Sequence, residues 1–269
     1  MRYFLFHQGV DIPDYIIHCI NQINIQDNTA DIYFCSNVYL HSDKVNFIDL
    51  NSLNLPDFNY FKNDPNPLWF TSLLRIFAIN AFAQKYGDNF IHFDNDVMLY
   101  GDFSNIKEHF DKKNYITPHK DTEFAFGFSY INNKDLFNDL TNNIYEMLKK
   151  GEDEVRRLTG DQIHEMRLLG YCNNGLIEPL PIHPKLGNIE NIIFDPSSWG
   201  QYVGGTHSGI PPGFIDNEQI AGKIFLENKP EIRFDNKNNK MYVEYNDKLY
   251  QLFNLHIHSK KLNSFNRYV

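Results

Sequence analysis

Two aspartates, Asp94 and Asp96, follow a short apolar segment, Phe90–Phe93, and are separated by Asn95. Carboxylates with this spacing at the end of a strand can share one hard cation such as Mg²⁺ or Mn²⁺, because these ions prefer oxygen ligands. Such a cation would neutralise a diphosphate. Ligands of open α/β sheets bind beyond the carboxyl ends of strands, so the context favours a metal site. Asp-x-Asp is also common by chance, and a solvated turn or a helix cap is the alternative.

The segment near the C-terminus, residues 254–261, carries a second set of polar groups. Side chains alternate along a strand, so Asn254, His256 and His258 would share one face. The imidazoles are candidate metal ligands, and the neighbouring Lys260 is a candidate cation for a phosphate. The alternative is that both histidines are surface residues of an edge strand.

Arg75 is the single charge in a helix-length segment, 73–83, that is otherwise apolar almost all round. A helix with this pattern is buried, and an unpaired charge within it would be costly. Arg75 must therefore have a partner. Either it forms an ion pair with Asp94 or another core carboxylate, or it makes a bidentate contact to a phosphate or carboxylate of a ligand.

Two further aspartates are candidates for acid–base chemistry. Asp161 would either cap a helix over 162–169 or contact the substrate as a base or sugar-hydroxyl partner. Asp195 would either initiate an Asx turn or supply a carboxylate to the glycine-rich segment at 195–217. That segment has neither the Gly-Lys-[Ser/Thr] of a P-loop nor a Gly-x-Gly-x-x-Gly after a strand, so P-loop hydrolysis of a nucleotide is not expected.

The elements that position these residues are predicted from hydrophobic periodicity. Apolar runs and amphipathic segments alternate in the first half of the chain, which predicts an α/β fold: a mixed, mainly parallel sheet flanked by helices, with a C-terminal antiparallel β-hairpin region. No Gly-, Ser- or Pro-rich linker divides the chain, so one domain over 1–269 is expected. The expected strands are 3–6, 31–35, 45–50, 90–93, 124–131, 231–234, 241–245 and 249–258, and the expected helices are 15–23, 68–86, 134–149 and 162–169.

Composition limits the class of protein. The 269 residues include 34 acidic against 25 basic ones, a formal net charge of -9. This balance does not favour a nucleic-acid partner, which needs clustered cations. No window reaches the roughly 18 uncharged apolar residues of a membrane span. The cysteines, Cys19, Cys35 and Cys172, show no CxxC spacing and are expected to be reduced and mostly buried. A cytoplasmic location is the default expectation, in a host cell if the protein is viral.

Taken together, these features resemble the nucleotide-sugar-dependent glycosyltransferases of the GT-A fold. The resemblance rests on the segments FIHFDNDVMLY, TGDQ, FDPSSWGQYVGG, PPGFIDNE and NLHIHSK. The chain is most similar to a group of bacterial and large-DNA-virus transferases that share GQYxGG and LHIHSK segments. The resemblance covers roughly residues 1–265, although only the quoted segments are specific, and it implies a GT-A-like, Rossmann-like sheet.

The resemblance also implies roles for individual residues. Asp96 would chelate a divalent cation, Mn²⁺ or Mg²⁺, and Asp94 would contact the ribose or sugar as well as the metal site. Either His256 or His258 would complete the coordination. The tail lacks the glycogenin-like His-x-x-Gly-x-x-Lys-Pro-Trp pattern and has His-x-His-Ser-Lys instead. The identity of the metal histidine and the stereochemical class therefore stay open.

Further residues are expected at the donor. Lys260 would neutralise the diphosphate, and Asn95 and Arg75 would lie beside it. The strand end Phe6-His7-Gln8 would hold the nucleobase.

The expected function is transfer of a hexose or deoxyhexose from a nucleotide diphosphate sugar, most simply a UDP-sugar, to a glycan or other hydroxyl acceptor. If the reaction inverts, Asp161 or Asp195 would accept the proton of the acceptor hydroxyl; if it retains, no strong base is needed. Trp199 and Tyr202 would stack on an acceptor sugar. The alternatives are a divalent-metal phosphohydrolase of sugar nucleotides and a non-catalytic sugar-binding module.

Overall fold

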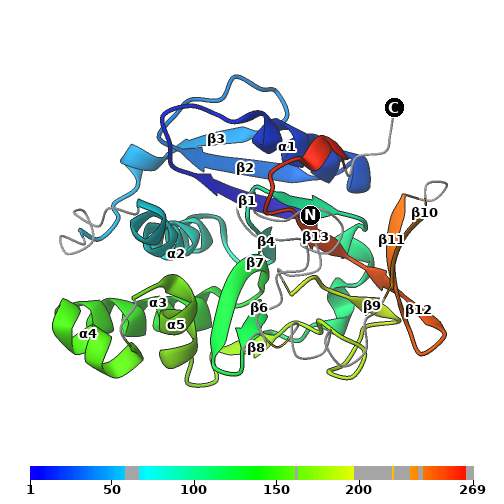
Figure 1. Cartoon of the computed structure of the whole chain (residues 1–269). Coiled ribbons are helices and arrows are strands. Elements are labelled where there is room, and N and C mark those ends of the chain that lie inside the picture. The colour runs from blue at the N-terminus through cyan, green and yellow to red at the C-terminus, as the bar shows by residue number, and fades with distance from the viewer. Residues whose placement is uncertain (58–66, 161–162, 197–219, 221–230, 236–238, 265–269) are drawn as a thin grey trace.

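The computed structural model describes residues 1–57, 67–160, 163–196, 220, 231–235 and 239–264 (Figure 1). Seven strands form the main sheet in the order β3-β2-β1-β4-β7-β6-β8. The first four are mutually parallel, β7 is antiparallel to both β4 and β6, and β8 is parallel to β6. The bounds are β1 Arg2–His7, β2 Asp31–Ser36, β3 Asn46–Asp49, β4 Phe90–His92, β6 Asn114–Lys120, β7 Glu123–Ile131 and β8 Ile177–Pro179.

Helices cover both faces of this sheet. Figure 1 shows α3, α4 and α5 grouped away from α1, which lies beside β2. The helices are α1 Asp14–Gln26, α2 Pro67–Tyr86, α3 Lys134–Leu148, α4 Glu152–Thr159 and α5 Glu165–Tyr171, and the 3₁₀ turns are η1 Leu50–Ser52, η2 Phe103–Asn105, η3 Lys107–His109 and η4 Leu262–Ser264. The predicted α/β class, with a mixed and mainly parallel sheet flanked by helices, is confirmed.

The central strand β1 shows why the sequence folds in this way. Its side chains alternate between two apolar cores: Tyr3 and Leu5 pack with α1, and Phe4 and Phe6 pack with α2. A strand that is buried on both faces is expected to be a continuous apolar run, as this one is. The buried positions of α1 recur at three- and four-residue intervals, which gives one apolar stripe.

A second sheet forms near the C-terminus, in the order β10-β11-β12-β9. Its tight turn at Asn246 and Asp247 has φ of 51° and 59°, values that Asn and Asp tolerate in the two-residue loops of hairpins. The antiparallel strands β10, β11 and β12 confirm the predicted hairpin region. The bounds are β9 Ile192–Ile193, β10 Glu231–Asp235, β11 Lys240–Tyr245 and β12 Lys248–Leu252.

Two local predictions were wrong. The strand expected over 249–258 is two strands, because after β12 the chain leaves that sheet at Phe253 and β13 (Asn254–His256) pairs with β5 (Val97–Leu99). The helix expected over 162–169 begins at Glu165, and its N-cap is His164 rather than Asp161. The preceding Gly160, at φ +99°, ends α4, so the glycine marks a helix end rather than the start of the next helix.

Two expectations from composition are also met. Cys19, Cys35 and Cys172 are all free and buried, as expected for reduced thiols. Among the helices of the described residues, none has the length and apolar composition that a membrane span requires.

Candidate metal centre

The turn between β4 and β5 carries the two aspartates. β4 is hydrogen-bonded to β1 and β7 in the middle of the main sheet and ends at His92, so Asp94 and Asp96 lie beyond its carboxyl end, as predicted. The backbone amide of Val97 donates to the carbonyl of Asp94 at 3.0 Å and closes the turn. Asp96 is buried, whereas Asp94 is half-buried.

The C-terminal tail is fastened to this turn by backbone pairing. In the antiparallel ladder of β5 and β13, His256 stands opposite Val97. The amide of Ile257 then donates to the carbonyl of Asp96 at 2.8 Å. The register therefore places the His256 side chain beside both carboxylates, although about 160 residues of chain separate them.

Asp94, Asp96 and His256 form a group with the chemistry of a metal site. One ligand atom from each lies within 4.8 Å of the others. The Nε2 atom of His256 is 3.0 Å from Oδ1 of Asp96 and 3.8 Å from Oδ2 of Asp94. Two carboxylate oxygens and one imidazole nitrogen, converging at a buried point, fit a divalent cation.

The titration of this group is strongly perturbed. Burial raises the pKa of Asp96, but the positive charge of His256 and Lys260 outweighs it and holds the pKa well below its usual range. Burial lowers the pKa of His256, but Asp96, with Asp94 and Asp195, raises it to about 9. A ligating imidazole is neutral, so a cation that binds here would displace a proton from His256.

The two tail histidines have different positions. The His258 ring stacks on that of His256, with ring centroids 4.1 Å apart and planes at 22°. The two rings therefore lie on one side of the tail, as the alternation predicts, but it is His256 whose nitrogen lies with the carboxylates. Direct coordination by His258 stays a prediction.

Lys260 also reaches the centre. Its Nζ donates to Oδ2 of Asp96 at 2.9 Å and lies 5.0 Å from the centroid of the Tyr15 ring on α1. Burial lowers the pKa of Lys260, but Asp96 outweighs it and the pKa is raised. The lysine is therefore charged, and its half-exposed side chain places an ammonium group at the edge of the centre.

Arg75 has two carboxylate partners. From α2 its guanidinium pairs with Asp94 through Nη1 and with Glu165, the first residue of α5, through Nη2. Its Cζ lies 5.4 Å from the centroid of the Phe126 ring. The predicted ion pair with Asp94 is present. A contact of Arg75 with a ligand stays a prediction.

Glu165 is the residue that sequence reasoning missed. Burial raises its pKa to about 7, against the opposing charge of Arg75. Its signal in the sequence was weak, because a single glutamate at the start of a helix is ordinarily a favourable first-turn residue.

Asp195 lies behind the tail and is fully buried. Its Oδ2 accepts a hydrogen bond from the backbone amide of His256 at 2.6 Å, and its own amide donates to Oδ1 of Asn254 at 3.1 Å. The carboxylate therefore holds the strand that carries His256. A role for Asp195 as a catalytic base stays a prediction.

The end of β1 lies close to the same turn. The side-chain Nδ2 of Asn95 donates to the carbonyl of Phe6 at 2.7 Å, which joins the turn to β1. The ring of His7 is bonded through Nε2 to the carbonyl of Asp11 at 2.8 Å, and Oε1 of Gln8 accepts from the hydroxyl of Thr71 at 3.2 Å. The predicted nucleobase segment and the carboxylate turn are thus neighbours.

Several predicted residues lie outside the described residues. These are Asp161, together with Gln162 of the same segment, and Trp199 and Tyr202 of the glycine-rich stretch. Apart from the helix cap expected of Asp161, which His164 supplies, the roles expected of them remain expectations.

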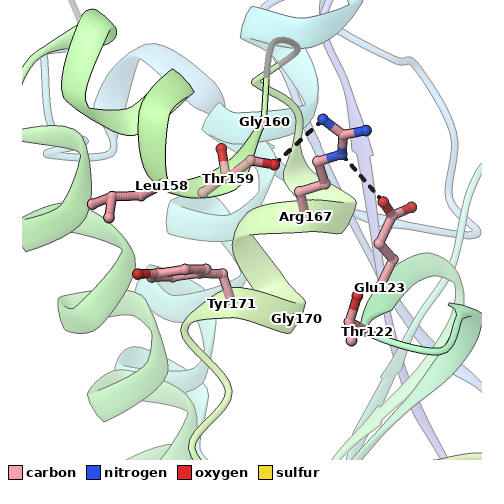
Figure 2. A pocket seen from close by; sticks show the side chains of 8 residues that line it. All are labelled: Thr122, Glu123, Leu158, Thr159, Gly160, Arg167, Gly170 and Tyr171. Atoms are coloured by element: carbon pink, nitrogen blue, oxygen red, sulfur yellow. Dashed lines mark hydrogen bonds and ion pairs between the residues drawn. The ribbon is translucent and has the colours of Figure 1, made fainter.

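A hollow of about 490 Å³ lies on another side of α5. Figure 2 shows Arg167 reaching across it to Glu123 at 3.2 Å and to the carbonyl of Thr159 at 3.3 Å, with Tyr171 on the wall near Leu158. None of the carboxylates or histidines of the metal centre lines this hollow, so it is separate from the centre.

No protein-family model matches the sequence, and neither does any curated protein. Among solved structures, the chain is similar to the galactosyltransferase LgtC in complex with donor and acceptor sugar analogs, at 14% identity and a TM-score of 0.46 over 67% of this chain and 73% of that one. It is also similar to the glycosyltransferase GlyE of Streptococcus pneumoniae TIGR4, at 14% identity and a TM-score of 0.46 over 66% of this chain and 44% of that one.

A third similar structure is mouse xyloside xylosyltransferase 1, at 12% identity and a TM-score of 0.43 over 67% of this chain and 84% of that one. The match spans less than half of the GlyE chain. Likeness at this level leaves the function to be argued from the residues of the site.

Proposed function

We propose that the protein is a metal-dependent glycosyltransferase of GT-A-like fold. It would transfer a hexose or deoxyhexose from a nucleotide diphosphate sugar, a UDP-sugar in the first instance, to a glycan or other hydroxyl acceptor. The observation that carries the proposal is the convergence of Asp94, Asp96 and His256 at one buried point, with the Lys260 ammonium at its edge. The motifs that resemble GT-A transferases support it from the sequence.

The residues of the centre would have two separate roles, metal binding and phosphate binding. Asp94, Asp96 and His256 would hold Mn²⁺ or Mg²⁺, and the cation would supply Lewis-acid stabilisation of the departing diphosphate. Lys260 would turn from Asp96 to a phosphate oxygen, because the cation would take over the charge of Asp96. After this exchange the charge of Lys260 would be balanced by a phosphate of the nucleotide sugar. The cation and Lys260 together would let a protein of net negative charge bind an anionic substrate.

The remaining residues would orient the donor and the acceptor. The segment Phe6-His7-Gln8 would line the nucleobase position, since Asn95 ties it to the metal turn. Arg75 would fix Asp94 and lie near the transferred sugar. In an inverting reaction Asp161 would be the base, because Asp195 is already occupied with the backbone amide of His256.

Donor cleavage with and without an acceptor tests this function. The protein would be incubated with a panel of UDP-sugars, Mn²⁺ and sugar acceptors, and UDP and phosphate would be measured separately. A transferase releases UDP mainly when a suitable acceptor is present, and chelation of the metal stops the release. Acceptor-independent formation of a sugar phosphate or inorganic phosphate would indicate a phosphohydrolase. Metal-dependent UDP binding without turnover on any donor would indicate a binding module.

A further inference from the structure

We propose that Glu165 is a positioning residue for the metal centre: through Arg75 it holds Asp94 in the orientation that the cation requires. The inference rests on the proposed metal-dependent function. Glu165 itself belongs to neither the Asp-x-Asp turn nor the tail, and it contributes no ligand atom to the group of Asp94, Asp96 and His256.

The geometry of Arg75 carries the argument. A guanidinium has a planar fork, so its orientation is fixed when two carboxylates bind different nitrogens. Here Nη1 binds Asp94 and Nη2 binds Glu165. The Arg75 and Glu165 side chains are only 12% and 7% exposed, so neither can relax into solvent. Glu165 therefore sets the direction from which Arg75 approaches Asp94.

The contact leaves the other oxygen of Asp94 for the metal. Oδ1 of Asp94 is bound by Arg75, whereas Oδ2 is the atom that faces Nε2 of His256 at 3.8 Å. A carboxylate fixed through one oxygen presents the second in a defined direction, as outer partners of metal ligands commonly achieve.

Above its pKa of about 7, the charge of Glu165 works in the same direction. Arg75 is paired with two carboxylates. Glu165 therefore offsets part of the positive charge of Arg75, which would otherwise repel a bound cation. Without the charge of Glu165, Arg75 would pair with Asp94 alone and compete more strongly with the cation for it. The electrostatic effect therefore predicts weaker metal binding when Glu165 is neutral.

The substitution Glu165→Gln tests this. Glutamine has nearly the same size and can still accept a hydrogen bond from Arg75, but it has no charge. Titration calorimetry with Mn²⁺ alone at about pH 8, where Glu165 is mostly ionised, should show affinity weakened by roughly tenfold or more. The EPR spectrum of bound Mn²⁺ should also change, because the coordination of Asp94 is altered, and a merely structural contact would not alter that spectrum.

Glu123→Gln is the matched control. Glu123 is also a buried glutamate paired with an arginine of α5, Arg167, at 3.2 Å (Figure 2). It lines the hollow beside α5, which none of Asp94, Asp96 and His256 lines. It should leave the Mn²⁺ affinity and the EPR spectrum as in the wild type. If Glu165→Gln does not fold by circular dichroism, Arg75→Lys replaces it, since an ammonium is a point charge without the rigid fork and should weaken binding in the same way.

Two results would overturn the inference while leaving the proposed function intact. The first is that Glu165→Gln, or Arg75→Lys in its place, binds Mn²⁺ as tightly as the wild type does. The second is that Glu123→Gln loses as much Mn²⁺ affinity as Glu165→Gln does. If the wild-type protein itself fails to bind Mn²⁺, the metal centre is wrong and the inference fails with it.

Discussion

Asp195 can either hold His256 in place or act as a catalytic base, and one substitution distinguishes these two roles. Its buried carboxylate accepts the backbone amide of His256 at 2.6 Å. Substitution Asp195→Asn keeps the shape but converts a charge-assisted hydrogen bond into a neutral one. Hydrogen bonds to charged groups contribute about 1.5–3 kcal/mol and neutral ones about 0.5–1.5, so the loss should be about 1–2 kcal/mol.

This loss should be visible at the metal centre. Because the bond fixes the backbone of His256, we expect Mn²⁺ affinity to fall by about tenfold, which corresponds to about 1.4 kcal/mol. The unfolding free energy without metal should fall by a similar amount. Turnover should recover when Mn²⁺ is raised to saturation if Asp195 acts only through the backbone of His256.

Calorimetry with Mn²⁺, urea unfolding and steady-state kinetics at saturating Mn²⁺ would be measured on the same preparations. A catalytic base would give the opposite pattern: unchanged Mn²⁺ affinity with kcat lowered by about 10²–10⁴ at saturation. That pattern would refute the positioning role of Asp195 and restore it as a candidate base.

Three further substitutions test other parts of the structure. Gly170→Ala should destabilise the protein by about 1–3 kcal/mol in urea unfolding, because the added Cβ would lie 1.6 Å from the carbonyl oxygen of Thr122; unchanged stability would contradict this packing of α5 against the β6–β7 turn. Burial lowers the pKa of His164 to about 4, below its value of about 6.5 in the unfolded chain. The folded protein therefore favours the neutral ring, and the stability that this contributes is present above about pH 6.5 and lost as the pH falls. His164→Asn keeps a capping side chain and should remove about 1–2 kcal/mol of the stability loss between pH 7 and pH 5; an identical pH profile would refute this. Lys260→Gln should weaken UDP binding in Mn²⁺ by about tenfold without weakening Mn²⁺ binding alone, since the lysine competes with the cation for Asp96; weaker binding of Mn²⁺ alone would contradict that competition.

Much of the fold follows from local pattern. The apolar run of β1 predicts a buried strand, and the three- and four-residue spacing of apolar residues in α1 predicts an amphipathic helix, because the two structures differ in period. The nearly all-apolar α2 is predicted to be buried and to need a partner for Arg75, and both hold. The Asp-x-Asp turn is found because it directly follows such a strand.

The features that escaped prediction depend on distant contacts. The alternation of residues 249–258 breaks at Leu252 and Phe253, two successive apolar residues, where the chain changes sheets. Such a pair does not indicate which strand comes next, and the partner of β13 is β5, far away in sequence. Alternation also places His256 and His258 on one face, and only the register with Val97 brings His256 to the carboxylates. Glu165 pairs with Arg75, which lies 90 residues earlier in the chain, and no local sequence pattern predicts that pairing.

The central claim is that the two aspartates and His256 hold a divalent cation that binds a nucleotide diphosphate. Calorimetric titration of UDP into the wild type and into Asp96→Ala, each with and without Mn²⁺, tests it most directly. We predict that the wild type binds UDP much more tightly with Mn²⁺ and that Asp96→Ala loses this increase. UDP affinity that is independent of Mn²⁺ in the wild type, or an undiminished Mn²⁺ effect in Asp96→Ala, would contradict the claim.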